Sequence, residues 1–186
     1  AIMIAMWTWV RGMGIVYRAE DIELAQTVAL KFLNRRLQSP AEAFELVKRE
    51  VRIARQITHP SVVRIYDLGV ADDEIFISME FVAGENLQSL VRRIGPLPAP
   101  KVAQIARQLV AGLAAAHDAG ILHRDLKPAN VMIDGAGDVR ILDFGIAAPL
   151  DDSQALQRVM GTPGFMPPEL LAGELPTARS DLFAWG

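Results

Sequence analysis

Two oxygen-bearing side chains stand at the two ends of one predicted hairpin. Strand-like runs at 131–133 and 139–142 flank the sequence Asp-Gly-Ala-Gly-Asp, and this pattern predicts a β-hairpin. In an antiparallel hairpin the residue before the first strand lies near the residue after the second, and Asn130 and Asp143 occupy these positions. An amide and a carboxylate are hard oxygen donors that suit Mg²⁺. Taken singly, each residue is better explained by the preference of Asn and Asp for turns.

A second carboxylate and a lysine lie close to this pair in the sequence. Asp125 precedes Asn130 by five residues, and Lys127 stands between them. If the oxygen donors converge, a metal could be held at phosphate oxygens, a cation could balance their charge and a carboxylate could orient a hydroxyl. The cluster therefore predicts chemistry on a phosphate group.

A further lysine and glutamate occupy positions where a lone charge would be costly. Lys31 ends the apolar run 28–31, and Glu50 falls on the apolar face of a predicted helix. A Lys31–Glu50 ion pair would satisfy both side chains. The alternative is two solvated charges at the edges of their elements.

The helix that carries Glu50 is predicted from its start signals and its apolar spacing. Ser39 can cap it, Pro40 suits the first helical position and Glu42 completes a capping box. The helix is predicted to end before His59-Pro60. Its apolar face is expected to contain Phe44, Val47, Val51 and Ala54.

Strands surround this helix, and a second long helix follows. Strands are predicted at 15–17, 27–32, 62–68 and 75–81, and the apolar first ten residues are interpreted as a further buried strand. The second helix is predicted over 100–119, ending at Gly120, with an apolar stripe of Val102, Ile105, Leu109, Leu113 and Ala116. A change of character near residue 84 predicts a sheet-rich lobe at 1–83 and a helical lobe at 84–186.

Composition excludes several classes of protein. The 186 residues carry a net charge of -3 without a run of Lys or Arg, so nucleic acid is not expected as a partner. The 51% of hydrophobic residues indicates a globular chain with a core. With no cysteine and only three scattered histidines, disulfide scaffolds, thiolate zinc sites and histidine-based metal sites are not expected. The apolar start is too short to span a bilayer, and no membrane segment is expected within the chain.

The motifs together resemble those of a Hanks-type protein kinase domain of the bacterial serine/threonine sort. Five segments stand in the family's order: the strand motif 28–31, the catalytic-loop signature 123–130, the triplet 143–145, the end of an activation segment at 161–169 and Ser180-Asp181 at the start of a large buried helix. The resemblance covers residues 11–186 and implies an α+β, protein-kinase-like fold with two lobes, the second incomplete. It implies ATP and Mg²⁺, with Mn²⁺ as a possible substitute, and protein substrates.

The resemblance also implies a role for each matching residue. Asp125 would orient the acceptor hydroxyl and take its proton, and Lys127 would steady the phosphoryl group. Asn130 and Asp143 would hold the metal, and Lys31, fixed by Glu50, would contact the α- and β-phosphates. The other residues expected to contact ATP are Gly12 and Gly14 in the glycine loop, Met79, Glu80 and Val82 at the hinge, Glu85 at the ribose, and Val16, Ala29 and Met132 around the adenine.

The activation segment carries the expected regulatory residues. Lys127 together with Thr162 resembles serine/threonine kinases more than tyrosine kinases. Arg124, which precedes Asp125, is typical of kinases activated by a phosphorylated loop residue, and Ser153 is the candidate phosphosite. Asp181 would brace the backbone near the catalytic loop, and Glu169 would pair with an arginine that lies beyond this sequence.

Two departures from the family pattern affect these expectations. Gly14 fits the third glycine of the phosphate loop, but Trp9 and Arg11 occupy the first two glycine positions and Gly12 lies beside the second. Either the loop is degenerate or residues 1–10 are foreign to the domain. The sequence also stops inside an apolar run, so we expect a truncated domain that is marginally stable alone.

Three functions fit the sequence. The first is a truncated protein serine/threonine kinase, the second a non-catalytic kinase-like module that binds nucleotide or a partner, and the third a small-molecule phosphotransferase of kinase-like fold. The third is disfavoured by the presence of Phe144-Gly145 and of the 161–169 segment. We expect a cytoplasmic domain, with a membrane anchor in a longer protein left open.

Overall fold

The computed structural model describes residues 2–11, 14–33, 40–71, 74–144 and 163–186, with the backbone alone for residues 2–11, 14, 40–43, 46 and 163. The chain forms two compact units. Unit 1 comprises Ala1–Arg55 and Val63–Val82, and unit 2 comprises Gln56–Val62 and Ala83–Gly186. The short segment 56–62 therefore belongs to unit 2, although the sequence on both sides of it belongs to unit 1.

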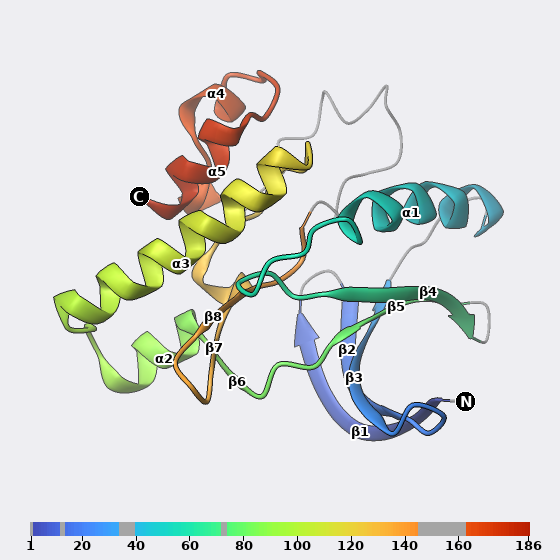
Figure 1. Ribbon diagram of the computed structural model, residues 1–186. Coiled ribbons are helices and arrows are strands. Elements are labelled where there is room, and N and C mark those ends of the chain that lie inside the picture. Colours follow the sequence, from blue (N-terminus) through green and yellow to red (C-terminus); the bar gives the residue numbers. More distant parts are fainter. Residues whose placement is uncertain (1, 12–13, 34–39, 72–73, 145–162) are drawn as a thin grey trace. The chain divides into compact units, whose positions relative to one another are not determined.

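Unit 1 is an antiparallel sheet with one helix (Figure 1). The strands lie in the order β1-β2-β3-β5-β4. Their bounds are β1 (Ile2–Arg11), β2 (Gly14–Asp21), β3 (Gln26–Leu33), β4 (Ile65–Ala71) and β5 (Glu74–Glu80), and the helix is α1 (Pro40–Ala54). The apolar start of the chain thus forms a strand, as predicted, and it lies at one edge of the sheet beside β2.

Alternation along β3 separates the charged residue from the apolar core. Val28 and Leu30 are 3% and 2% exposed and pack with Ala19 on one face. Lys31, between Leu30 and Phe32, points to the opposite face because successive side chains of a strand alternate. The aromatic rings of Phe32 and Phe76 lie 5.5 Å apart at the edge of this core.

The helix α1 begins at Pro40, as predicted, and buries the predicted face. Val47, Val51 and Ala54 are 0%, 3% and 7% exposed. The predicted end at His59-Pro60 is wrong, because the helix stops at Ala54. The chain leaves the helix there since Ile57, 5% exposed, packs in the core of unit 2. Ser39 and the side chain of Glu42, which would form the capping box, lie outside the described part.

Unit 2 contains a small sheet and several helices (Figure 1). The sheet has the order β6-β7-β8 and antiparallel pairing. The strands of this sheet are β6 (Gly84–Asn86), β7 (Val131–Asp134) and β8 (Val139–Ile141). The helices of unit 2 are α2 (Leu87–Ile94), α3 (Ala99–Asp118), the 3-10 helix η1 (Pro128–Asn130), the 3-10 helix η2 (Pro163–Phe165), α4 (Pro168–Leu171) and α5 (Ala178–Trp185). The β7–β8 hairpin is the one predicted from its turn sequence.

The long helix α3 packs against this hairpin by apolar and polar contacts. Ile105, Leu109, Leu113 and Ala116 form its buried stripe, as predicted. Gln108 holds the hairpin turn: its Oε1 accepts the Val139 N–H at 2.8 Å and its Nε2 donates to Asp138 Oδ1 at 3.0 Å. The prediction that Val102 belongs to the stripe is wrong, since Val102 is 44% exposed. Lys101 faces the hairpin instead, and its Nζ donates to the Gly137 carbonyl at 3.0 Å.

The segment 56–62 is fixed to the same hairpin. The Ile141 N–H donates to the Ser61 carbonyl at 2.8 Å, and Val62 forms a parallel bridge with Ile141. The helix α3 approaches this segment closely at Gly112, where a Cβ would lie 2.8 Å from Ile141 Cδ1 and 3.2 Å from Ser61 Cβ. The strand predicted to start at Val62 consequently starts later, at Ile65.

The helix α2 was not predicted. In α2, the Asn86 side chain accepts the Ser89 N–H at 2.9 Å and Gly95, with φ 81°, follows the last turn. Asn at the N-cap and Gly after the end are standard helix signals, but the helix spans only eight residues.

Within the described ranges, no helix combines the length and the apolar character needed to cross a membrane.

Candidate active site

The predicted catalytic residues of unit 2 converge in one short segment. Lys127 Nζ lies 2.6 Å from Asp125 Oδ2. Asn130 Nδ2 donates to the Asp125 carbonyl at 2.8 Å and lies 3.4 Å from Asp125 Oδ2. The three side chains are therefore held together around the Asp125 carboxylate, and Asn130 is only 5% exposed.

The orientation of Asn130 determines which of its atoms could bind a cation. Since the amide nitrogen donates to Asp125, the amide oxygen is the atom that this side chain can offer as a metal ligand. The Asn130 carbonyl accepts the Leu142 N–H at 2.9 Å, which places the backbone of Asn130 one residue from Asp143. The donor set of an amide oxygen and a carboxylate fits Mg²⁺. Among the described residues, no three His, Asp or Glu side chains form a metal site by themselves.

A buried carboxylate in α5 holds the backbone on the N-terminal side of Asp125. Asp181, 2% exposed, accepts the His123 N–H at 2.8 Å through Oδ2 and the Arg124 N–H at 2.9 Å through Oδ1. Its Oδ2 also lies 2.8 Å from His117 Nε2, which must donate because a carboxylate only accepts. Three hydrogen bonds thus compensate the burial of this charge.

The ring of His123 connects the catalytic segment to the hairpin. His123 Nε2 lies 2.8 Å from the Leu142 carbonyl, and Nδ1 lies 3.4 Å from the Asp125 N–H. Burial lowers the pKa of His123, although Asp181, the Leu142 carbonyl, Asp143 and Asp125 act in the opposite direction. Because Nδ1 accepts the Asp125 N–H, the proton of the neutral ring lies on Nε2, facing the carbonyl acceptor. It also packs on Phe144, with the ring centroids 4.9 Å apart.

Backbone strain occurs at two residues of this site. Arg124 has φ 68° and Asp143 has φ 63°, in the left-handed region that residues other than glycine rarely adopt. Such strain costs of order 1–3 kcal/mol at each residue and persists only where the surroundings impose it. The hydrogen bond from Arg124 N–H to Asp181 is one such constraint.

The predicted ATP-contacting residues of unit 1 lie on neighbouring strands, on α1 and, for Val82, two residues after the end of β5. Lys31 on β3 is 4% exposed and stands opposite Val16 on β2 and Ile77 on β5 in the strand register. Ala29 and Met79, 8% and 6% exposed, also stand opposite each other. Val16, Glu50, Glu80 and Val82 are half-buried. The Lys31–Glu50 ion pair stays a prediction.

The remaining ATP-contacting predictions fall in unit 2. Met132 on β7 is 7% exposed, and Glu85 on β6 stands opposite Ile133. Arg93 of α2 holds the Glu85 carboxylate through both Nε and a terminal nitrogen, at 3.1 and 2.7 Å from Oε2. This contact raises the pKa of Arg93, chiefly through the hydrogen bond to Glu85. Arg93 was not predicted as a site residue, and a Glu–Arg pair eight residues apart is too common a pattern to have signalled it.

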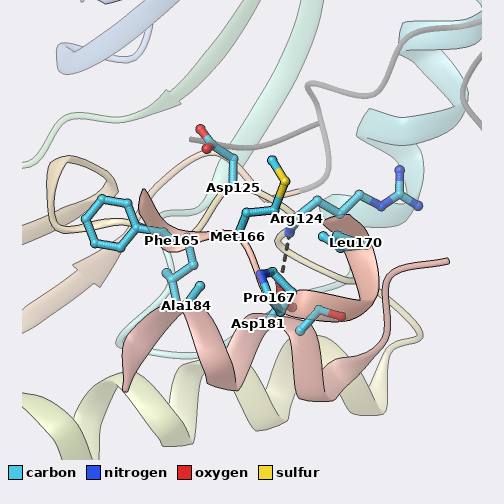
Figure 2. Close-up of a pocket in the computed structure, with 10 residues that line it drawn as sticks. Arg124, Asp125, Phe165, Met166, Pro167, Leu170, Asp181 and Ala184 are labelled. Atoms are coloured by element: carbon cyan, nitrogen blue, oxygen red, sulfur yellow. Dashed lines mark hydrogen bonds between the residues drawn. The ribbon is translucent and has the colours of Figure 1, made fainter. Parts of the chain in front are cut away.

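A small pocket of about 20 Å³ lies beside the catalytic segment, with room for about one water molecule (Figure 2). It is lined by Arg124, Asp125, Leu126, Phe165, Met166, Pro167, Leu170, Ser180, Asp181 and Ala184. Figure 2 shows the Arg124 guanidinium pointing away from the Asp125 carboxylate, while the dashed hydrogen bond joins the Arg124 backbone to Asp181. Phe165, the segment that follows it and the helix α5 therefore line this pocket together with Asp125.

Glu169 has a local partner in the structure. Ser180 Oγ donates to Glu169 Oε1 at 2.9 Å and accepts the Thr177 N–H at 3.0 Å, within a capping box that starts α5. The expected arginine beyond the sequence is therefore not needed to satisfy this oxygen. Of the other predicted site residues, Gly14 starts β2, while Gly12, Ser153 and Thr162 lie outside the described residues.

Comparison with known proteins yields one family. The family model described as "Protein kinase domain" matches residues 12–186. The serine/threonine-protein kinase pkn2 of Myxococcus xanthus is 42% identical over 183 residues, which cover 94% of this chain and 22% of the relative. The serine/threonine-protein kinase PrkC of Bacillus subtilis is 39% identical over 177 residues, covering 94% and 27%. The chain thus spans about a quarter of the length of these relatives.

Proposed function

Because the chain belongs to the protein kinase family, we propose that it transfers the γ-phosphoryl group of ATP to serine or threonine hydroxyls of proteins. The observation that carries this proposal is the cluster of Asp125, Lys127 and Asn130, joined by contacts of 2.6 and 2.8 Å. All four candidate catalytic and metal-binding residues of unit 2, Asp143 included, stand at the positions where the family signature requires them.

Each side chain of the cluster has a role that its contacts support. Asp125 accepts hydrogen bonds and would orient the substrate hydroxyl and take its proton. Lys127, already 2.6 Å from Asp125, would counter the charge of the transferring phosphoryl group. The Asn130 amide oxygen and the Asp143 carboxylate would hold Mg²⁺, or Mn²⁺ in its place. The metal would supply charge neutralisation at the phosphate oxygens.

Unit 1 would supply the residues that bind ATP away from the reacting phosphate. Lys31, on a buried strand, would contact the α- and β-phosphates, with Glu50 as its partner. Met79, Glu80 and Val82 would lie at the hinge and contact the adenine. We accordingly propose that unit 1 acts as the N-terminal lobe and unit 2 as part of the C-terminal lobe, and that the domain works in the cytoplasm, where ATP is available.

The direct test is phosphate transfer from radiolabelled ATP to a casein-like protein by the purified protein. We expect transfer that requires Mg²⁺ and falls by about 10²–10⁴-fold in Asp125→Asn, because this change removes the general base and keeps the shape. Asp138→Asn, an exposed carboxylate of the hairpin turn, is the matched control and should retain activity. Transfer that survives in Asp125→Asn would refute the proposal.

A non-catalytic nucleotide-binding module is the second candidate. One observation favours it: Trp9 and Arg11 stand at the first two glycine positions of the phosphate loop and lie within strand β1, opposite Val16 and Gly14. This candidate predicts that MgATP binds, that no phosphate is transferred, and that Asp125→Asn leaves the ATP affinity unchanged.

A further inference from the structure

Glu85 has a backbone position fixed by the strand that follows the catalytic segment. The strand β6 pairs with β7 so that Glu85 stands opposite Ile133. At the preceding residue the two backbones approach so closely that a Cβ on Gly84 would lie 2.2 Å from the Ile133 carbonyl oxygen. A residue at position 84 with a side chain would push β6 away from β7. The Glu85 backbone is therefore tied to the hairpin.

The Glu85 side chain is fixed separately, by the far end of α2. Asn86 caps this helix through the Ser89 N–H, so that the helix starts immediately after Glu85. Arg93, in the last turn, returns to Glu85, with Nε at 3.1 Å and a terminal nitrogen at 2.7 Å from Oε2, and Nε at 3.5 Å from Oε1. The helix and the ion pair form a closed loop that restricts the rotamers of both side chains.

This ion pair is poorly placed to contribute to stability. The Arg93 and Glu85 side chains are 62% and 31% exposed, and exposed pairs contribute little to stability because water and salt screen them. What a two-nitrogen contact does provide is position, since Nε and a terminal nitrogen both hold Oε2 and Oε1 lies at the longer distance of 3.5 Å from Nε. A half-buried carboxylate with one oxygen held in place is a preorganised acceptor for hydrogen-bond donors.

We propose that Arg93 is a positioning residue that holds the Glu85 carboxylate as an oriented acceptor for the vicinal hydroxyls of the ATP ribose. The inference rests on the proposed function and on the expected contact between Glu85 and the ribose. A sugar that lacks the 2′-hydroxyl offers one donor fewer to the same carboxylate. Arg93 would therefore set the preference for ATP over 2′-deoxyATP, because without it Glu85 must be ordered when the nucleotide binds.

The experiment compares the affinities of ATP and 2′-deoxyATP, each with Mg²⁺, by calorimetric titration of the purified protein. In the unaltered protein we expect ATP to bind about 5–10-fold more tightly than 2′-deoxyATP, the size of one ordinary net hydrogen bond. In Arg93→Ala this ratio should fall to about 2, mainly because ATP binds more weakly. Arg93→Lys, which keeps the charge and loses the two-nitrogen contact, should give an intermediate ratio.

Two further variants separate positioning from general charge or folding effects. Arg92→Ala removes the neighbouring exposed arginine of the same helix and should leave the ratio unchanged. In a Glu85→Ala background, Arg93→Ala should have no further effect on the ratio, because its target is gone. The ratio is read only from variants with the melting temperature of the unaltered protein, and Arg93→Lys serves if Arg93→Ala unfolds.

The outcomes distinguish the inference from the proposed function. If the unaltered protein binds ATP but the ratio is the same in Arg93→Ala and Arg93→Lys, or falls equally in Arg92→Ala, the positioning role is refuted and the kinase proposal stands. If the unaltered protein neither binds MgATP nor transfers phosphate, the proposed function fails and the inference fails with it.

Discussion

The candidate residues of the two units are held in place by different kinds of interaction. In unit 2, Asp125 and its neighbours are fixed by directional bonds: Asp181 accepts two backbone N–H groups, and His123 reaches the Leu142 carbonyl. In unit 1, the β3 backbone that carries Lys31 is held by strand register and by the apolar burial of Leu30 and Val28. The catalytic segment of unit 2 therefore depends on individual polar atoms, and the strand β3 on the volume of the core beside it.

The sharpest test of this comparison is removal of the Asp181 carboxylate. We expect Asp181→Ala to lower the free energy of unfolding by about 3–5 kcal/mol, because the buried N–H groups of His123 and Arg124 lose their acceptor. Phosphate transfer should be lost as well. Equilibrium urea unfolding with activity assays checks both effects. Asp181→Asn keeps one acceptor oxygen, so its free energy of unfolding should lie between those of the unaltered protein and Asp181→Ala. A loss below about 1 kcal/mol in Asp181→Ala would show that these hydrogen bonds do not hold the catalytic segment in place.

The counterpart in unit 1 is truncation of the apolar core. Leu30→Ala should cost about 2–4 kcal/mol, since Leu30 is 2% exposed and a cavity would remain. Leu24→Ala is the matched control: this leucine is 71% exposed, and its truncation should cost less than about 0.5 kcal/mol. Urea unfolding of both variants measures the difference. Equal effects at positions 30 and 24 would show that burial does not support β3.

A smaller effect is expected from the titration of His123. Burial lowers its pKa in the folded protein below the ordinary value of 6.5, so the unfolded chain binds the proton more readily. The free energy of unfolding should therefore fall as the pH decreases below about 6.5, by up to about 1.4 kcal/mol per pH unit, and be unaffected by this group above that pH. Urea unfolding between pH 5 and 7.5 measures the slope. In His123→Phe the part of the slope due to this ring should vanish, and an unchanged slope would contradict the neutral buried histidine.

The smallest expected effect tests the close approach in unit 2. In Gly112→Ala the new Cβ would lie 2.8 Å from Ile141 Cδ1, so side chains must shift, while the better helix propensity of alanine offsets part of the cost. We expect a net loss of about 1 kcal/mol, measured by thermal unfolding. Gly135→Ala has no atom within 4 Å of its new Cβ and should be neutral within about 0.5 kcal/mol. A more stable Gly112→Ala protein would show that this contact is loose.

Local signals in the sequence predicted the elements whose ends are marked by distinctive residues. The start of α1 at Pro40 and the β7–β8 turn are examples, because proline and the Asp-Gly pattern restrict the backbone by themselves. The end of α1 at Ala54 was missed since it depends on where Ile57 packs, which is a tertiary contact. Val102 was misplaced for a related reason: in the first turn of α3 it is Lys101 that contacts the hairpin, at the Gly137 carbonyl.

The catalytic residues were predicted from motifs in the sequence. The residues that hold the site's side chains in place were predicted less well. Asp125, Lys127 and Asn130 carry a spacing that restricts their chemistry, whereas Arg93 and Ser180 have no such signature. Their importance comes from the partner they reach in space, and that partner lies eight and eleven residues away in sequence. The bracing role of Asp181, expected from the resemblance, is matched by its hydrogen bonds to the backbone of His123 and Arg124.

The membership of residues 56–62 in unit 2 has a consequence for dissecting the protein. The chain passes from one unit to the other after Arg55, Val62 and Val82, so neither unit is a single uninterrupted stretch of the gene product. A fragment starting at residue 83 would lack Ile57 and Val62 from its interior and the Ser61 carbonyl that receives the Ile141 N–H. Splitting the polypeptide at 82/83 should therefore yield two pieces that regain their native conformation only when mixed.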